Sequence, residues 1–203
     1  MSINSQKKKT VVLKQLLIYY NSFVRIKQRV CIILKEVVFT SKPLIVYFSE
    51  SGTTKKFAED IKDITGGDLF RIEPAFKYPT EYEELADFAR NERDRDLRPE
   101  IKNKLNNLDD YNNVFLGYPM WWYTFPQIIR TFLDTYDLSG KTIIPFNTHE
   151  GSGDGGTYKE LQDYVPNAKV LVGLPIRGTN MKYDQKGNIK EWLDSLKIDF
   201  KNN

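Results

Sequence analysis

Cysteine and histidine are almost absent from this chain of 203 residues, since Cys31 and His149 are the only ones. A single cysteine cannot form a disulfide within the chain, and the pair cannot build a zinc cluster of the usual kind. A Ser-His-Asp arrangement would have to include His149. Because disulfides are excluded, a reducing compartment is the natural one, and we expect the protein to be cytoplasmic.

Long uncharged stretches are also missing from the N-terminal part of the chain. The longest such run there, residues 15–24, is only ten residues, whereas about 18 are needed to span a bilayer. We therefore expect no transmembrane segment. Residues 1–40 carry eight Lys and Arg residues against Glu36 alone, a net charge of +7, so the total of +3 leaves −4 for the rest. The acidic body of the protein, residues 41–203, argues against nucleic-acid binding. It suits a protein that docks on positive partner surfaces.

Hydroxyl side chains gather where a short apolar run, Leu44–Phe48, gives way to a helical pattern. The pattern predicts a strand, a turn and the start of a helix. Backbone N–H groups and the positive end of the helix dipole would then point at one place, which suits a phosphate. The candidate phosphate-binding residues are Ser49, Glu50, Ser51, Gly52, Thr53 and Thr54. A simple helix cap would use a single hydroxyl, and no G-x-x-x-x-G-K-[ST] loop occurs in the chain.

This hydroxyl-rich segment resembles the phosphate loop of the flavodoxins, which bind flavin mononucleotide (FMN). Two further segments, residues 117–126 and 148–156, are similar to the loops that hold the flavin ring in a short-chain branch of that family. The resemblance runs from about Lys42 to Leu196 and implies FMN as the cofactor. It adds these candidate FMN-binding residues: Pro119, Met120, Trp121, Trp122, Thr148, His149, Glu150, Gly151, Ser152 and Gly153.

Apolar segments alternate with amphipathic ones from residue 42 onward, which predicts an α/β fold with a parallel sheet covered on both faces. The expected strands are Leu44–Phe48, Leu69–Ile72, Asn113–Gly117, Thr142–Phe146 and Val170–Leu174. The expected helices lie near Thr53–Ile64, Tyr82–Arg93, Phe125–Tyr136, Thr157–Tyr164 and Gly187–Leu196. These fit a flavodoxin-like, doubly wound, five-stranded parallel sheet of order 2-1-3-4-5 in three α/β/α layers. The three candidate loops follow strands 1, 3 and 4, so they should meet at one crevice.

Three aromatic residues in a row, Trp121, Trp122 and Tyr123, follow the third expected strand. Exposed aromatic rings are costly to hydrate unless something covers them, and a flavin ring could stack on one of them. We expect Trp122 to be the stacking residue, with at least one of the other rings turned into the core. The family more usually has glycine at the positions of Tyr123 and Glu150.

The string Gly151-Ser-Gly-Asp-Gly-Gly156 matches G-x-G-x-x-G, but it lies late in the sheet and the next strand ends without an acidic residue. A flexible loop whose amides face the flavin explains it better than a dinucleotide site. A carboxylate at Glu150 about 10 Å from a reduced, anionic flavin would cost about 1.7 kcal/mol at an effective dielectric of about 20. We therefore expect Glu150→Gln to raise the potential of that reduction step by tens of millivolts.

Three functions remain open. The first is an FMN electron carrier with a reductase and an acceptor enzyme as redox partner proteins. The second is an NAD(P)H-dependent FMN oxidoreductase of the quinone or flavin reductase type, and the third is a flavin-free binding or signalling module.

Residues 1–40 form a basic, partly amphipathic extension of the domain expected over residues 41–203. That extension would lie on a membrane surface, dock on a partner or the body, or be a gene-model artefact. The charged run 91–98 is expected to be a solvated helix end.

Overall fold

The computed structural model describes residues 42–198. The predicted N-terminal extension, with its membrane-surface or docking role, lies outside the described residues. Within residues 42–198, no helix is long and apolar enough to cross a membrane.

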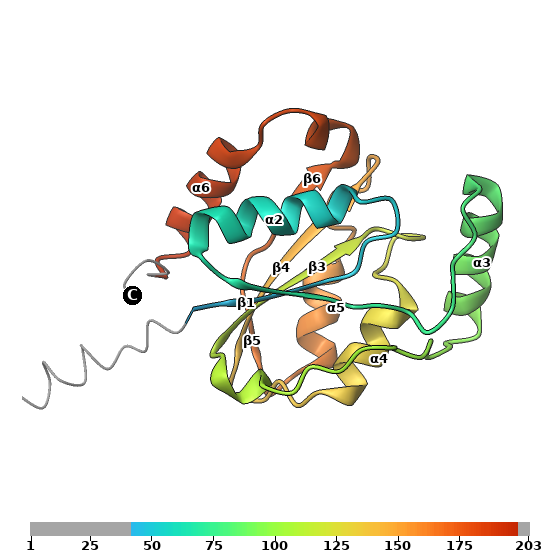
Figure 1. The fold of residues 1–203 in the computed structure, drawn as a ribbon, viewed down its shortest axis with the longest axis horizontal. Coiled ribbons are helices and arrows are strands. Elements are labelled where there is room, and N and C mark those ends of the chain that lie inside the picture. Colours follow the sequence, from blue (N-terminus) through green and yellow to red (C-terminus); the bar gives the residue numbers. More distant parts are fainter. Residues whose placement is uncertain (1–41, 199–203) are drawn as a thin grey trace, which may run out of the picture. The chain divides into compact units, whose positions relative to one another are not determined.

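A parallel sheet forms the centre of the fold (Figure 1). Its strands run in the order β2-β1-β3-β4-β5, and every neighbouring pair is parallel. This order confirms the predicted doubly wound topology. The direction of winding reverses between β1 and β3, so the carboxyl ends of these two strands form the switch point at which ligands bind in such sheets. The strands are β1 (Leu44–Tyr47), β2 (Asp68–Arg71), β3 (Asn113–Pro119), β4 (Thr142–His149) and β5 (Lys169–Val170).

The fifth strand differs from the prediction. It was expected as one segment, Val170–Leu174, but β5 stops at Val170 and a separate strand β6 (Leu174–Arg177) also pairs with β4. In the register of the two strands, Ile143 pairs with Val170 and Phe146 with Leu174. Three residues of the fifth strand therefore lie opposite two of β4, which is the geometry of a β-bulge.

Pro145 gives the physical reason for this interruption. Ile143 O accepts a hydrogen bond from Leu171 N, at 2.9 Å, so by alternation along the strand Pro145 also faces the fifth strand. A proline has no N–H to donate to the ladder there. Gly173 fits beside it because an ideal Cβ at that position would lie only 2.4 Å from the carbonyl oxygen of Pro145.

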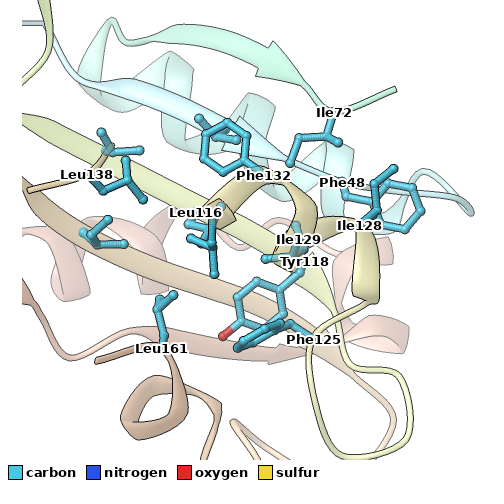
Figure 2. Packing of buried hydrophobic residues seen from close by; sticks show 14 of the residues in the cluster. Phe48, Ile72, Leu116, Tyr118, Phe125, Ile128, Ile129, Phe132, Leu138 and Leu161 are labelled. Atoms are coloured by element: carbon cyan, nitrogen blue, oxygen red, sulfur yellow. The ribbon is translucent and has the colours of Figure 1, made fainter. Parts of the chain in front are cut away.

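Helices cover both faces of the sheet, as predicted. Alternate residues of β1 point to opposite faces, with Ile45 toward α2 (Thr53–Thr65) and α6 (Lys186–Ser195). Val46 points toward α4 (Gln127–Thr135) and α5 (Thr157–Tyr164). Figure 2 shows the second of these clusters, in which the aromatic rings of Phe48, Tyr118, Phe125 and Phe132 pack with aliphatic side chains. The two cores hold the carboxyl ends of β1, β3 and β4 in fixed positions.

Helix α3 (Tyr82–Asp94) covers neither face. It lies beyond the carboxyl ends of the strands (Figure 1) and packs against α4 and the segment that follows β3. The charged run at its end was expected to be solvated, but Glu92 is only 3% exposed. That interpretation is therefore wrong for Glu92. Two short 3-10 helices, η1 (Leu108–Asp110) and η2 (Gly178–Lys182), complete the described elements.

Candidate functional site

The three segments predicted to hold a cofactor meet at the carboxyl edge of the sheet. Met120 N donates a hydrogen bond of 2.8 Å to Thr148 O, which links the segment after β3 to the end of β4. The buried hydroxyls of Thr54 and Thr148 share a hydrogen bond of 2.7 Å, which links the start of α2 to the same place. Phe48 N, at the end of β1, donates to Gly117 O at 3.0 Å. The topology therefore gathers the candidate residues of all three loops.

The loop between β1 and α2 contains an unpaired, buried hydroxyl. Ser49 is 2% exposed, and among residues 42–198 its Oγ has no hydrogen-bond partner. A buried polar atom of this kind normally finds a partner, so an orphan marks a place where a ligand group fits. Glu50 is half-buried, and Ser51 and Gly52 are exposed on the outer side of the loop.

Helix α2 begins without a cap. Gly52 precedes it with φ +87°, a left-handed conformation that favours glycine, and no side chain of the described residues caps the helix. Among residues 42–198, no protein oxygen accepts a hydrogen bond from the N–H groups of Ser51 to Thr54. The hydroxyls of Ser51 and Thr53 lie 3.1 Å apart beside these amides. The first turn of α2 thus presents free donors of the kind that bind an anionic phosphate.

No Lys or Arg lies within residues 49–54, but Arg71, which was not among the predicted site residues, brings a positive side chain to this loop. Arg71 stands at the end of β2, and its Nη2 donates a hydrogen bond of 3.1 Å to Ser49 O. Parallel pairing of β1 with β2 places Arg71 opposite Tyr47, one residue before the loop. The orphaned hydroxyl, the free amides and the nearby guanidinium together fit a phosphate ester.

The aromatic segment after β3 divides its side chains between the core and α3. Trp121 turns inward and packs edge-on against Phe48, with ring centroids 5.4 Å apart. Trp122 lies against α3, where its Nε1 donates a hydrogen bond of 2.8 Å to Ala86 O and Arg90 covers its ring at 4.1 Å. A second guanidinium group, that of Arg93, lies 5.5 Å from the centroid of the same ring. Stacking of a flavin on Trp122 stays a prediction.

Tyr123, one of the two departures from the family pattern, is 74% exposed. Its φ is +63° and that of Trp122 is +52°, both in the left-handed region where a side chain is strained. The turn is closed by two hydrogen bonds between Trp121 and Thr124, of 3.0 and 3.1 Å. Glycine would adopt the backbone conformation at Tyr123 more easily. The backbone of residues 122 and 123 is therefore strained.

The glycine-rich loop after β4 is held by hydrogen bonds from residues that were not among the predicted site residues. Asn147, fully buried in β4, donates from Nδ2 to Gly153 O at 2.9 Å and accepts from the Tyr158 hydroxyl at 2.6 Å. Thr157 accepts a hydrogen bond of 2.9 Å from the Tyr118 hydroxyl and donates to Asp154 O at 2.6 Å. The available signal was an asparagine directly after the apolar run of residues 143–146.

His149 and Glu150 begin this loop. The Nδ1 of His149 accepts a hydrogen bond of 2.9 Å from Gly151 N, and burial lowers the pKa of its imidazole. The Glu150 carboxylate lies 3.5 Å from Arg177 Nε, and both side chains are exposed. The remaining candidate, Ser152, is half-buried. The loop therefore offers backbone amides and one partly neutralised carboxylate. Within the described part of the chain, no group of His, Cys, Asp and Glu could hold a metal ion.

Known proteins resemble this chain over most of its length. The model of the flavodoxin family matches residues 42–196. None of the curated proteins matches the chain. A solved structure from Bacteroides eggerthii DSM 20697, described as a "putative flavoprotein", is 34% identical with a TM-score of 0.70, over 78% of this chain and 99% of that one. One with the same description from Bacteroides uniformis ATCC 8492 is 32% identical with a TM-score of 0.68, over 76% and 98%.

A flavoprotein from Lactobacillus acidophilus NCFM, solved in complex with FMN, shares the fold. It is 23% identical with a TM-score of 0.60, and the match covers 70% of this chain and 97% of that one. The family match over most of the chain, together with two solved structures above 30% identity, leads to one conclusion. The chain belongs to the flavodoxin family.

Proposed function

We propose that residues 42–196 bind FMN and carry electrons between a reductase and an acceptor enzyme in the cytoplasm. The observation that supports this most directly is the buried, unpaired hydroxyl of Ser49 beside the uncapped start of α2. The flavoprotein from Lactobacillus acidophilus NCFM that was solved in complex with FMN has the same fold. The acidic body suits docking on positive surfaces of the two partner proteins.

In this proposal each loop has one task. Ser49 and the amides and hydroxyls of Ser51 to Thr54 hold the phosphate. The segment 119–122 and the loop 148–153 border the flavin ring, exclude water from it and present backbone groups to its edges. FMN, when bound, supplies the electron-transfer chemistry, and the protein sets its orientation and electrostatics.

The visible absorption spectrum of the purified full-length protein tests the proposal. We expect an oxidised-flavin spectrum, and stepwise anaerobic reduction that proceeds in two resolvable one-electron steps. Protein that remains colourless after incubation with FMN would contradict the assignment of the site. Oxidation of NAD(P)H by the pure protein without a reductase would instead favour the oxidoreductase.

The Ser49→Ala substitution should have opposite effects on stability and on binding. Without flavin, removing an unsatisfied buried hydroxyl should raise the free energy of unfolding by about 1 kcal/mol. The same change should weaken FMN binding about tenfold, because one hydrogen bond to the phosphate is lost. Urea unfolding of the flavin-free protein and FMN titration measure the two effects.

The control for stability is Ser51→Ala, which removes an exposed hydroxyl. It should change the free energy of unfolding by no more than about 0.5 kcal/mol. Equal effects of both substitutions on stability would show that the Ser49 hydroxyl is already satisfied.

The ion pair between Glu150 and Arg177 changes the expected effect of charge near the flavin. Glu150→Gln should still raise the potential of the step that makes the flavin anionic, by about 10–40 mV, because Arg177 already screens part of the charge. Arg177→Gln should lower the same potential. Redox titration against reference dyes measures both shifts. Shifts of the same sign in the two variants would mean that charge at this pair does not act on the flavin.

A further inference from the structure

Glu92 is buried, and its carboxyl group has one polar partner within the described part of the chain, the Tyr78 hydroxyl. Both carboxylate oxygens lie within hydrogen-bond distance of the Tyr78 hydroxyl, at 3.2 and 3.1 Å. Glu92 forms no ion pair within residues 42–198. Burial raises its pKa to about 7. An unpaired carboxylate is expensive to bury, so a purely structural role would be served better by a neutral side chain.

The partner of Glu92 occupies a central place among the aromatic side chains at this end of the sheet. The ring of Tyr78 contacts Phe48 at 5.6 Å and Trp121 at 5.3 Å between centroids. Phe48 and Trp121 also contact each other. Phe48 directly precedes Ser49 in the first loop, and Trp121 belongs to the second. A single ring, held by one carboxyl group, therefore touches both segments that border the candidate site.

We propose that Glu92 is a positioning residue for the flavin site, acting through the Tyr78 hydroxyl to fix Phe48 and Trp121 and hence the two loops that carry them. This inference rests on the proposed binding of FMN. Helix α3 covers neither face of the sheet, and the proposal gives it a role in supporting the site. The same helix also holds the neighbouring indole, since Trp122 Nε1 donates to Ala86 O.

The charged groups around this pair are few. From the segment after β2, the titratable group that faces Glu92 is Tyr78 itself, whose pKa is raised by burial and by Glu92. The Glu50 carboxylate in the first loop also acts on Tyr78 in the same direction. On α3, the guanidinium groups of Arg90 and Arg93 lie over the Trp122 ring. Ionisation of Glu92 thus places a new charge beside the ring that touches Trp121.

Tryptophan emission of the flavin-free protein tests the pair without requiring FMN. Between pH 5.5 and 8.5 we expect the wild-type emission to titrate with a midpoint near 7, the pKa of Glu92. Glu92→Gln should remove this titration, and Trp121→Phe should remove most of its amplitude. Glu84→Gln, which changes an exposed carboxyl on the same helix, is the matched control and should titrate like the wild type. A titration that persists in Glu92→Gln would overturn the assignment to Glu92.

FMN dissociation constants test the positioning role. Tyr78→Phe keeps the ring and removes the hydroxyl, and we expect it to weaken FMN binding about fivefold. Glu92→Leu should weaken binding to a similar extent, while Glu92→Gln, which keeps an acceptor for Tyr78, should recover most of that loss. Binding by Tyr78→Phe and Glu92→Leu at the wild-type affinity would overturn the proposal. If the wild type itself fails to bind FMN, the proposed function is wrong, and the emission titration still decides whether Glu92 acts on Trp121.

Discussion

The Gly117→Ala variant should lose about 3 kcal/mol of its free energy of unfolding. An ideal Cβ at Gly117 would lie 2.1 Å from Cζ of Phe146 and 2.4 Å from its Cε2. The two residues are register partners on β3 and β4, and the Phe146 ring is fully buried against Phe57, with centroids 4.8 Å apart. Because the ring is fully buried, it can make room for a methyl group only by displacing its own neighbours. Urea unfolding of the flavin-free protein, followed by circular dichroism, gives the value.

A second glycine provides the matched control. Gly187 lies in the first turn of α6, and a Cβ there would meet no atom within 4 Å. Gly187→Ala should therefore be neutral or stabilise by up to about 1 kcal/mol, because alanine loses less backbone entropy in a helix. Adding Phe146→Leu to Gly117→Ala should restore part of the lost stability by making space. Equal stabilities of the two alanine variants would show that the sheet can absorb a methyl group at Gly117.

The stability of the protein should depend on pH through Glu92. Its pKa is near 7 in the folded protein, above the ordinary value of 4.5, so the folded state binds more protons than the unfolded state between these two values. The free energy of unfolding contributed by this group must then fall as the pH rises through that window and level off above about 7. The full pKa shift of Glu92 corresponds to about 3 kcal/mol of the free energy of unfolding. We expect about 2 kcal/mol, because local relaxation lets water approach the carboxyl group.

The Glu92→Gln variant isolates this contribution, since glutamine does not titrate. The variant should gain stability relative to the wild type as the pH rises from 5 to 8, by about 2 kcal/mol in total. Unfolding in urea at a series of pH values measures the difference, and other titrating groups cancel between the two proteins. A difference that stays constant with pH would mean that Glu92 is solvated in the folded state.

The parts of the fold that follow local rules were predictable. The apolar run of β1 and the hydroxyl-rich turn after it predicted a strand, a turn and a helix, and the structure has the strand at Leu44–Tyr47 and the helix at Thr53–Thr65. The sheet order followed from the alternation of strands and helices and from the family resemblance. These features depend on periodicity within short windows, which one sequence displays fully.

The parts that depend on contacts between distant segments were not predictable. The break in the fifth strand arises from Pro145 on the neighbouring strand, a pairing that periodicity does not reveal. The orientation of Trp122 is set by Ala86 and Arg90 on α3, which lie 36 and 32 residues earlier in the chain. Glu92 sits in a charged run whose local pattern indicates solvent, and only the packing around Tyr78 buries it.

The two outer edges of the sheet have a consequence for self-association. An edge strand with a long, flat row of free N–H and C=O groups can pair with a second copy and start an aggregate. Here β2 is four residues long and carries Asp68 and Arg71 at its ends, while the opposite edge is divided by the bulge, with Val172 turned out to solvent at 76% exposure. The bulge that Pro145 imposes therefore disfavours the addition of a strand from a second molecule at this edge, and the short, charged β2 does the same at the other edge. We expect any association between copies to use side chains rather than the backbone ladder.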